Sequence, residues 1–575
     1  MREKEKIEMK HNEETKNEKK HSEGDRDGGD VLSSVLEHVG EMGRYQKLLF
    51  LAMMPFGFFF AFVYFVQMFI AATPQQHWCR VPEMEHLDVD IRRNLTAVHV
   101  DGVWDRCLTY RANWSEVLET MTAPHPSTPT QRCENGWEFQ LGDIPYHTVI
   151  SERGWVCEYA GFGPLAQAVF FAGSFVGGIF FGWLADTFGR VPALVGTNMM
   201  GCIGGVASIF TTGLWDFAFC RFLVGMAYDS CFMMMYILVL EYVGPRHRTW
   251  VANMSIALFF GGGCLVLPWL AVWIADWRTL LLATSLPMLA VLAAPLVVPE
   301  SARWLSSRGR VNQAVKVLKR FERVNGTKIP QDVMDEFIVA SRQTRQENES
   351  ITALFRSGPL RRMMLCMVVV YMGCALIFDG LVRMSEGLGL DFFITFTLAS
   401  ATEIPSVTLL ALILDRYGRR MLTVGPLSIA GALTLIAAAV PKGIPQVSLA
   451  IMARFCVNMA YNAAIQWSTE LLPTRVRASG SSLIHVSGYV ATVVSPFIVY
   501  SERAWAPLPL ILLGSLGVGA AACGIMLPET RGQHMPQTIA DGERLVRQHS
   551  LCGKPEVDDE DTEELKINKQ GALIT

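Results

Sequence analysis

The chain has 575 residues, of which 51% are hydrophobic and 18% are charged. Average soluble domains carry about 25% charged residues, and apolar runs of membrane length recur along this chain, so its composition excludes an ordinary soluble domain and predicts an all-α polytopic membrane protein. The net charge of −4 gives no indication of nucleic-acid binding.

The N-terminal segment, residues 1–46, is predicted to stay outside the membrane. Residues 1–30 are rich in lysine and glutamate and nearly free of large apolar groups, so we expect a disordered cytoplasmic tail. Residues 32–46 are predicted to form a short interfacial helix. The first membrane span then covers 47–72, and the charged start of the chain does not match a cleavable signal peptide.

The next stretch, 73–158, is polar and contains no apolar run of membrane length. An even number of cysteines in such a loop predicts disulfides and the oxidising, extracellular side of the membrane. Four cysteines allow three pairings, and the sequence does not choose among them. Two sequons make Asn94 and Asn113 candidate glycosylation sites. The cysteines are Cys79, Cys107, Cys133 and Cys157.

Eleven further spans are predicted, in two groups. Five lie between residue 160 and residue 298, and six lie between 361 and 527. A basic amphipathic linker, 299–360, separates the groups and contains a predicted surface helix at 310–324, and a polar tail follows at 528–575. Arginine and lysine crowd alternate loops, so the positive-inside rule places the linker and both termini in the cytoplasm.

A charged turn occurs twice in the chain, once in each group of spans. The first copy contains Asp186 and Arg190, and the second contains Asp415 and Arg419, each 229 positions later. Glycine permits a tight reversal between two helices, and arginine holds that end of a hairpin in the cytoplasm. The repeat predicts an internally duplicated protein with twelve transmembrane helices in two six-helix pseudo-repeats.

The chain resembles the major facilitator superfamily, and within it solute carrier family 22, the organic ion transporters. The resemblance rests on the two Asp-x-x-Gly-Arg turns, the large cysteine-containing first loop, and the segments at 299–314, 469–480 and 527–532. It covers nearly all of residues 32–535 and is greatest to the animal organic cation branch, including insect carcinine-type transporters. It implies a plasma-membrane carrier.

Ionisable residues predicted near the middle of the membrane are candidate binding groups, because a charge at that depth needs a partner or a cavity. Asp229 shares one face of the fourth span with Phe232 and Tyr236. Glu403 is predicted near the middle of the eighth span. No lysine or arginine is expected at the same depth, since Arg221 and Arg454 are placed towards the outer ends of their spans. Further lining candidates are Phe378, Asp379, Asn462 and Tyr489.

Carboxylates with aromatic faces favour an amine or a quaternary ammonium. In the resembled family the eleventh helix of cation carriers typically holds an aspartate, and the matching position here is Tyr489, so the acid is hypothesised to have moved to Asp229. His485, one turn earlier, is either a titrating group or, more simply, a structural histidine. The alternative for the acids is pairing with Arg221 or Arg383, or proton coupling.

A second charge set lies in the predicted cytoplasmic loops and is interpreted as a gate. Transporters of this class open alternately to either side, and a network of ion pairs can bias such an equilibrium. No nucleotide-binding loop or hydrolase motif is present, so we expect no enzyme activity, no cofactor and no metal. The gate residues are Asp186, Arg190, Glu241, Arg246, Glu300, Arg303, Asp415, Arg419, Glu470, Arg475 and Glu529.

The sequence therefore predicts a transporter of small organic cations or zwitterionic amines. Two alternatives stay open. One is the same fold carrying organic anions or carnitine-like zwitterions, and the other is a membrane receptor that has lost transport. The oligomeric state and the energy source are not determined by these patterns.

Overall fold

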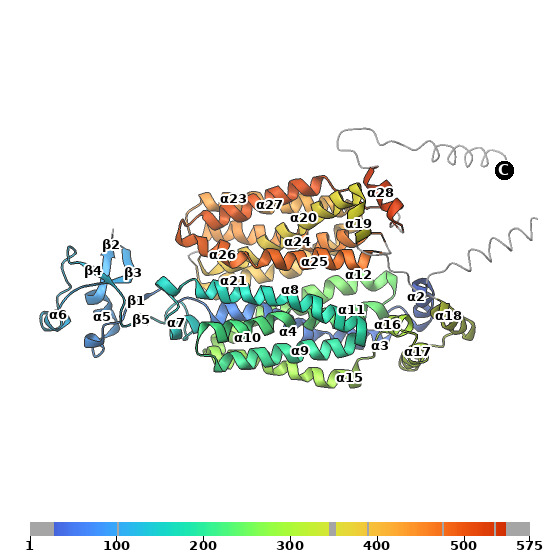
Figure 1. Cartoon of the computed structure of the whole chain (residues 1–575), viewed down its shortest axis with the longest axis horizontal. Helices are drawn as coiled ribbons and strands as arrows, with labels where there is room; N and C mark the ends of the chain where they lie inside the picture. Colours follow the sequence, from blue (N-terminus) through green and yellow to red (C-terminus); the bar gives the residue numbers. More distant parts are fainter. Residues whose placement is uncertain are drawn as a thin grey trace, which may run out of the picture.

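Two helical bundles lie side by side in the computed structural model (Figure 1). The first bundle is built from helices α3, α4 and α8 to α15, and the second from α20 to α27. A small domain extends from one end of the first bundle, and short linker helices cover the opposite end. We call these the loop-domain end and the linker end. The described residues are 28–100, 103–343, 352–387, 390–473, 476–533, 536 and 538–547.

Eleven stretches of the described chain are long and apolar enough to cross a membrane. A twelfth helix, α24 (Ile444–Leu471), has 28 residues and several buried polar groups. The predicted arrangement of transmembrane helices in two sets of six is thus confirmed. The eleven stretches are Arg44–Ile70 (α3, α4), Cys157–Phe188 (α8), Arg190–Phe210 (α9), Leu214–Tyr242 (α10, α11), Arg246–Ile274 (α12, α13), Trp277–Val297 (α14, α15), Gly358–Glu386 (α20), Phe392–Tyr417 (α21, α22), Arg419–Ala439 (α23), Ser479–Arg503 (α25, α26) and Leu508–Ile525 (α27).

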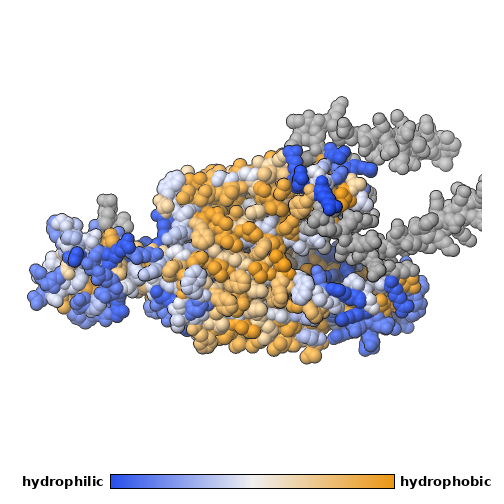
Figure 2. All heavy atoms as spheres, in the orientation of Figure 1, coloured by the Kyte–Doolittle hydropathy of each residue, from blue (hydrophilic) through white to orange (hydrophobic). Residues whose placement is uncertain are grey.

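Figure 2 shows an apolar belt across the visible face of both bundles, between the two polar ends. Large apolar side chains such as Trp183, Trp273 and Leu412 are exposed on this surface. Contiguous apolar surface of this extent is costly in water and favourable in lipid. The belt therefore marks the part of the molecule that lies in a bilayer.

The N-terminal region departs from the expected single interfacial helix. Helix α2 (Gly28–Val39) ends before Gly40, which has a φ of +98°, and α3 (Arg44–Ala52) starts the first span three residues earlier than predicted. The amide of Asn325 bridges this turn by donating to the Val39 carbonyl at 3.1 Å and the Gln46 side chain at 2.9 Å. The turn is thereby fixed against the linker helices.

The linker is helical where the structure describes it. Helix α17 (Val311–Asn325) confirms the predicted surface helix, and its buried face packs the Phe321 ring between Tyr45 and Tyr242, each with a centroid distance of 4.4 Å. The other short helices at this end are α16 (Ala302–Ser307), α18 (Gln331–Gln343), α19 (Thr352–Arg356) and α28 (Ile539–Arg547).

The loop domain has two small antiparallel sheets, one of strands β1 and β5 and the other in the order β2-β3-β4. Its four cysteines pair as Cys79–Cys133 and Cys107–Cys157, one of the three pairings that the sequence left open. Both sequon residues, Asn94 and Asn113, are exposed, and glycosylation there remains a prediction. The elements are β1 (His77–Cys79), α5 (Val89–Thr96), β2 (Ala97–Val100), β3 (Val103–Tyr110), α6 (Trp114–Thr120), β4 (Thr130–Arg132), β5 (Trp137–Phe139) and α7 (Val149–Arg153).

Candidate functional site

The two bundles are joined by aromatic contacts near the loop-domain end. The Phe69 ring lies 5.2 Å from Phe392 and 5.0 Å from Phe396. Deeper in the interface, the Tyr64 hydroxyl donates to Asp379 at 2.8 Å. Since Phe69 and Tyr64 belong to α4 (Met54–Ile70) and their partners to α20 and α21, these contacts close the two halves against each other at this end.

Asp379 is neutralised by an arginine on its own helix. Its carboxylate accepts from Arg383 Nε at 2.6 Å, and its side chain is 1% exposed. This is the pairing that the sequence analysis held as the alternative to substrate contact. The Arg383 guanidinium also lies 5.4 Å from the Phe171 ring of the other bundle, so this ion pair belongs to the contact between the halves.

Glu403 forms a second buried ion pair, with Arg454 at 2.7 Å. The expectation that no arginine shares the depth of Glu403 is therefore wrong. Asn458 Nδ2 donates to the same carboxylate at 2.6 Å, and the Arg454 guanidinium lies 3.5 Å from the Phe378 ring. Buried ions are tolerated when they are paired and hydrogen-bonded, and both charges here meet that condition. Glu403 and Phe378 therefore already interact with Arg454 of the protein.

A second internal repeat shows that Arg454 has a counterpart in the first bundle. The pattern Arg-Phe-x-Val-x-Met-Ala-Tyr occurs at 221–228 and again at 454–461. The first arginine differs from the second, because Arg221 donates through Nε to Gln67 at 2.8 Å while its two terminal nitrogens have no partner among the described residues. The residues that follow the two patterns are Asp229 and Asn462, so one bundle presents an acid where the other presents an amide.

Asp229 lies at a local break in the fourth span. Helix α10 (Leu214–Ala227) ends before Tyr228, and α11 (Ser230–Tyr242) starts after Asp229, while the backbone keeps its helical direction. The carboxylate points across the interface towards α25 (Arg477–Thr492), where His485 Nδ1 lies 3.7 Å away. No lysine or arginine of the described chain forms an ion pair with Asp229, which distinguishes it from the other two acids.

Tyr489 completes this group. Its hydroxyl lies 3.0 Å from His485 Nδ1, and its side chain also hydrogen-bonds to Asp229. The Asp229 and His485 side chains keep 16% and 27% of their surface exposed. An acid of the first bundle and a histidine and a tyrosine of the second therefore meet at one point between the two halves.

Aromatic rings surround this point in both bundles. In the first bundle, Phe60 stacks on Tyr228 at 5.1 Å and on Phe232 at 5.6 Å, and Phe232 lies 5.6 Å from Tyr236. In the second bundle, Tyr371 lies 5.1 Å from Tyr461 and 5.7 Å from His485. Asn462 is buried and donates to Asn458. Of the predicted lining residues, Tyr489 thus bonds to Asp229, while Phe232 and Tyr236 belong to the ring cluster that also contains Tyr228, the neighbour of Asp229.

The repeated turns at the linker end have matching geometry. Gly189 and Gly418 have φ values of +116° and +88°, a region that favours glycine. Glu300 then accepts from the backbone N–H groups of Arg190 and Val191 at 2.9 and 3.1 Å. Glu529 accepts from the corresponding groups of the second turn at the same distances. Each glutamate caps a helix whose N-terminus attracts negative charge.

The two turns differ in their side-chain pairs. Arg190 pairs with Asp186 at 2.7 Å, whereas Arg419 pairs with both Asp415 and Glu470 at 3.0 Å. Glu241 corresponds to Glu470, and its Oε2 is buried without a hydrogen-bond partner among the described residues. Arg246 and Arg303 are exposed, and Arg475 lies outside the described residues. The second turn is therefore the more strongly bonded.

Every ion pair described at the linker end joins residues of one bundle. On this side of Asp229 a hydrogen bond from Gln466 to Asn253 (3.3 Å) joins the two halves. Figure 2 shows a recess between the bundles beside the linker helices. Because the aromatic contacts close the other end, this arrangement corresponds to a carrier that is more open at its linker end.

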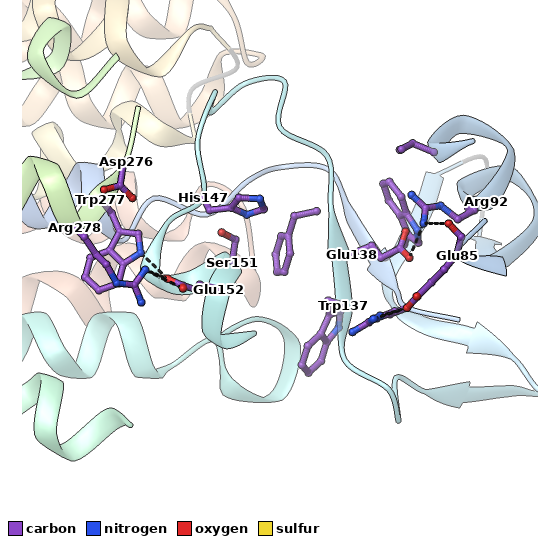
Figure 3. Close-up of a pocket in the computed structure, with 14 residues that line it drawn as sticks. Glu85, Arg92, Trp137, Glu138, His147, Ser151, Glu152, Asp276, Trp277 and Arg278 are labelled. Atoms are coloured by element: carbon purple, nitrogen blue, oxygen red, sulfur yellow. Dashed lines mark hydrogen bonds and ion pairs between the residues drawn. The ribbon is translucent and has the colours of Figure 1, made fainter. Parts of the chain in front are cut away.

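A separate cavity of about 720 Å³ lies where the loop domain meets the first bundle (Figure 3). Its charged residues pair with one another: Arg92 with Glu138, and Arg278 with Glu152 at 2.7 Å. Burial raises the pKa of Glu152, but hydrogen bonds from Arg278 and Trp277 outweigh this and hold the pKa below its usual value. The cavity is thus lined by pairs that already satisfy one another.

Comparisons with known proteins agree on the class. Residues 164–538 match the family model described as "Sugar (and other) transporter". The chain is 30% identical to a β-alanine transporter of Drosophila melanogaster, over 91% of this chain and 90% of the relative. It is 30% identical to solute carrier family 22 member 3 of Mus musculus, over 91% and 98%. This chain belongs to solute carrier family 22 of the major facilitator superfamily.

The fold of this family 22 chain agrees with solved structures. The xylose transporter XylE from E. coli, in its inward open conformation, aligns with a TM-score of 0.57 at 14% identity, covering 85% of this chain and 98% of XylE. A carcinine transporter of Drosophila melanogaster is 28% identical over 89% of this chain and 79% of the relative. The protein is therefore a membrane-spanning carrier of a small molecule, and not an enzyme.

Proposed function

We propose that this carrier transports small organic cations or zwitterionic amines across the plasma membrane by alternating access, with Asp229 as the group that binds the substrate cation. The loop-domain end faces the extracellular side, and the linker end and both termini face the cytoplasm. Phe232, Tyr236 and Tyr489 supply the aromatic faces of the site. The gate residues at the linker end bias the equilibrium between its two orientations.

A single observation carries the proposal: of the three acids predicted near the middle of the membrane, Asp229 is the one that no guanidinium or ammonium of the described chain neutralises. Asp379 and Glu403 are occupied by Arg383 and Arg454. An unpaired carboxylate at low dielectric attracts a substrate cation strongly. The rings around it add cation–π attraction of about 0.5–2 kcal/mol for each good contact.

The names of the relatives support an amine substrate. Two of them are called β-alanine transporter and carcinine transporter. Other family 22 members that are equally similar have names that state no substrate, including member 7 of Homo sapiens at 32% identity. The choice between cation and anion therefore rests on the charge of the site.

Uptake measurements test the proposal. Cells that express the chain are assayed with labelled tetraethylammonium, carcinine, β-alanine and a dicarboxylate. We expect uptake of at least one amine, a large loss in Asp229→Asn and partial retention in Asp229→Glu. Asp332→Asn removes an exposed acid of α18 and serves as the matched control. Uptake of the dicarboxylate alone, unaffected by Asp229→Asn, would overturn the assignment in favour of an anion carrier.

A further inference from the structure

We propose that this carrier exchanges its substrate cation for a proton, and that His485 carries the proton by competing with the substrate for Asp229. The inference rests on the proposed function, since it concerns the same carboxylate. It adds an energy source, because a proton gradient then drives the transport.

The geometry of three side chains is the basis. His485 Nδ1 lies 3.7 Å from the Asp229 carboxylate, and the Tyr489 hydroxyl bonds to both. A protonated imidazole at this position is a tethered cation in the place where a substrate ammonium would bind. The neutral imidazole has no such attraction and leaves the carboxylate to the substrate. Imidazole is the side chain that most readily gains and loses a proton under physiological conditions.

The groups that contact His485 come from two helices of the second bundle and one of the first. They are Asp229 on the fourth span, Tyr371 on α20 and Tyr489 on its own helix. Tyr461 packs against Tyr371, and Tyr228 against Tyr489. All except Asp229 are tyrosines, which are neutral near physiological pH. Asp229 is thus the one charged group that forms an ion pair with the imidazole in the described chain, and no arginine of the described chain forms an ion pair with Asp229.

Each exchange is balanced in atoms and charge. When a substrate cation reaches Asp229, an N–H bond of the imidazolium breaks, its electron pair stays on the nitrogen, and the proton passes to water in the recess at the linker end. One positive charge replaces another beside Asp229. Simultaneous occupancy by both is disfavoured because two cations would lie within a few ångströms at low dielectric. The result is an electroneutral exchange of one proton for one monovalent cation.

The position of the pair suits this coupling. Asp229 belongs to the first bundle and His485 to the second, so the distance between them changes as the halves rock. Imidazolium or substrate each adds a charge–charge attraction between the halves, whereas the empty carboxylate keeps only its hydrogen bond to Tyr489. Reorientation therefore requires one cation or the other, which is the condition for obligatory exchange.

Purified protein in liposomes tests the inference with labelled tetraethylammonium or carcinine, whichever the chain carries. With the lumen at pH 6.0, the outside at pH 7.5 and no membrane potential, we expect accumulation of about 30-fold, since each pH unit is tenfold in proton activity. His485→Gln keeps a hydrogen-bonding side chain and should exchange labelled substrate only for unlabelled substrate in the lumen, with no accumulation in empty liposomes. His125→Gln, in an exposed turn of the loop domain, should accumulate it as the wild type does.

The outcomes separate the two proposals. Wild-type uptake that reaches only equilibrium would overturn proton exchange and leave the carrier assignment intact. Accumulation that persists in His485→Gln would overturn the role of His485. Absence of cation uptake under every condition would overturn the proposed function as well. A measurement without variants is also available: binding of tetraethylammonium at pH 6.5 in weak buffer should release a proton, and at pH 8.5 it should release none.

The kinetics give a further check. If proton and substrate compete for Asp229, acidification on the substrate side raises KM by up to tenfold per pH unit and leaves kcat unchanged. A structural role for His485 would lower kcat in the variant without changing the pH dependence of KM. A pH-independent KM in the wild type would contradict the inference.

Discussion

Glu403 and Arg454 form an ion pair of 2.7 Å, with side chains 1% and 2% exposed, inside the second bundle. The corresponding arginine of the first bundle, Arg221, has the amide of Gln67 in place of a carboxylate. The arginine is therefore present in both copies of the repeat. Of these two arginines, only Arg454 has a carboxylate partner among the described residues. This asymmetry makes the two arginines a matched pair for mutation.

We expect Arg454→Met to lower the free energy of unfolding by about 3–5 kcal/mol, because Glu403 would be left buried and unpaired. Arg221→Met should lower the free energy of unfolding by less, because it leaves no buried opposite charge unpaired. Thermal unfolding of the purified protein measures both. The double variant Arg454→Met with Glu403→Leu should recover most of the loss, and equal losses in the two single variants would contradict this account.

The turns at the linker end are expected to control transport rate without affecting substrate affinity. Asp186→Asn and Arg419→Ala should each lower kcat for uptake and leave KM nearly unchanged, because neither residue lies near Asp229. Arg419→Ala should have the larger effect, since Arg419 bonds to both Asp415 and Glu470. Unchanged uptake by variants that reach the cell surface would refute a gating role.

The disulfides are expected to stabilise the loop domain by constraining its unfolded state. Cys107→Ser should leave Cys157 unpaired and lower the free energy of unfolding of the loop domain by about 2–4 kcal/mol. Peptide mapping without reduction should recover Cys79 joined to Cys133, and Cys107 to Cys157. Recovery of either other pairing would show that the loop domain has a different chain path.

His77 should make the loop domain sensitive to acid. Burial lowers the pKa of His77 to about 4, and its Nδ1 lies 3.0 Å from the Pro74 carbonyl. A histidine with a lowered pKa binds fewer protons when folded, so its contribution is complete above the unfolded pKa of about 6.5 and is lost as the pH falls from 6.5 to 4. Hydrogen exchange of the β1 amides should therefore speed up between pH 6.5 and 4.5, after correction for the intrinsic rate. In His77→Asn this dependence should be weaker.

The sequons provide a test of orientation. Asn94 and Asn113 are exposed in the loop domain, whereas the sequon residue Asn325 is held at the linker end by its bonds to Val39 and Gln46. If the loop domain is extracellular, deglycosylation should reduce the mass of the wild type but not of Asn94→Gln/Asn113→Gln. A glycan on Asn325 would reverse the proposed topology.

The sequence by itself determined the fold class, because membrane helices follow from local apolar length and the duplication follows from a fixed spacing. Asp186 with Arg190, and Asp415 with Arg419, are one helical turn apart, so their pairing was implied by local geometry. The pairing of Asp379 with Arg383 has the same origin. These interactions depend on the helix and hardly on the rest of the molecule.

Only the tertiary structure decided which of the three membrane acids has no arginine partner. Glu403 meets Arg454 because α22 (Glu403–Tyr417) packs against α24, a contact between residues 51 positions apart that no local period encodes. Asp229 meets His485 because the two bundles come together there, and the cysteines pair as they do because the strands of the loop domain bring them within reach. Charge compensation inside a membrane depends on distances between helices, and those distances are set by packing.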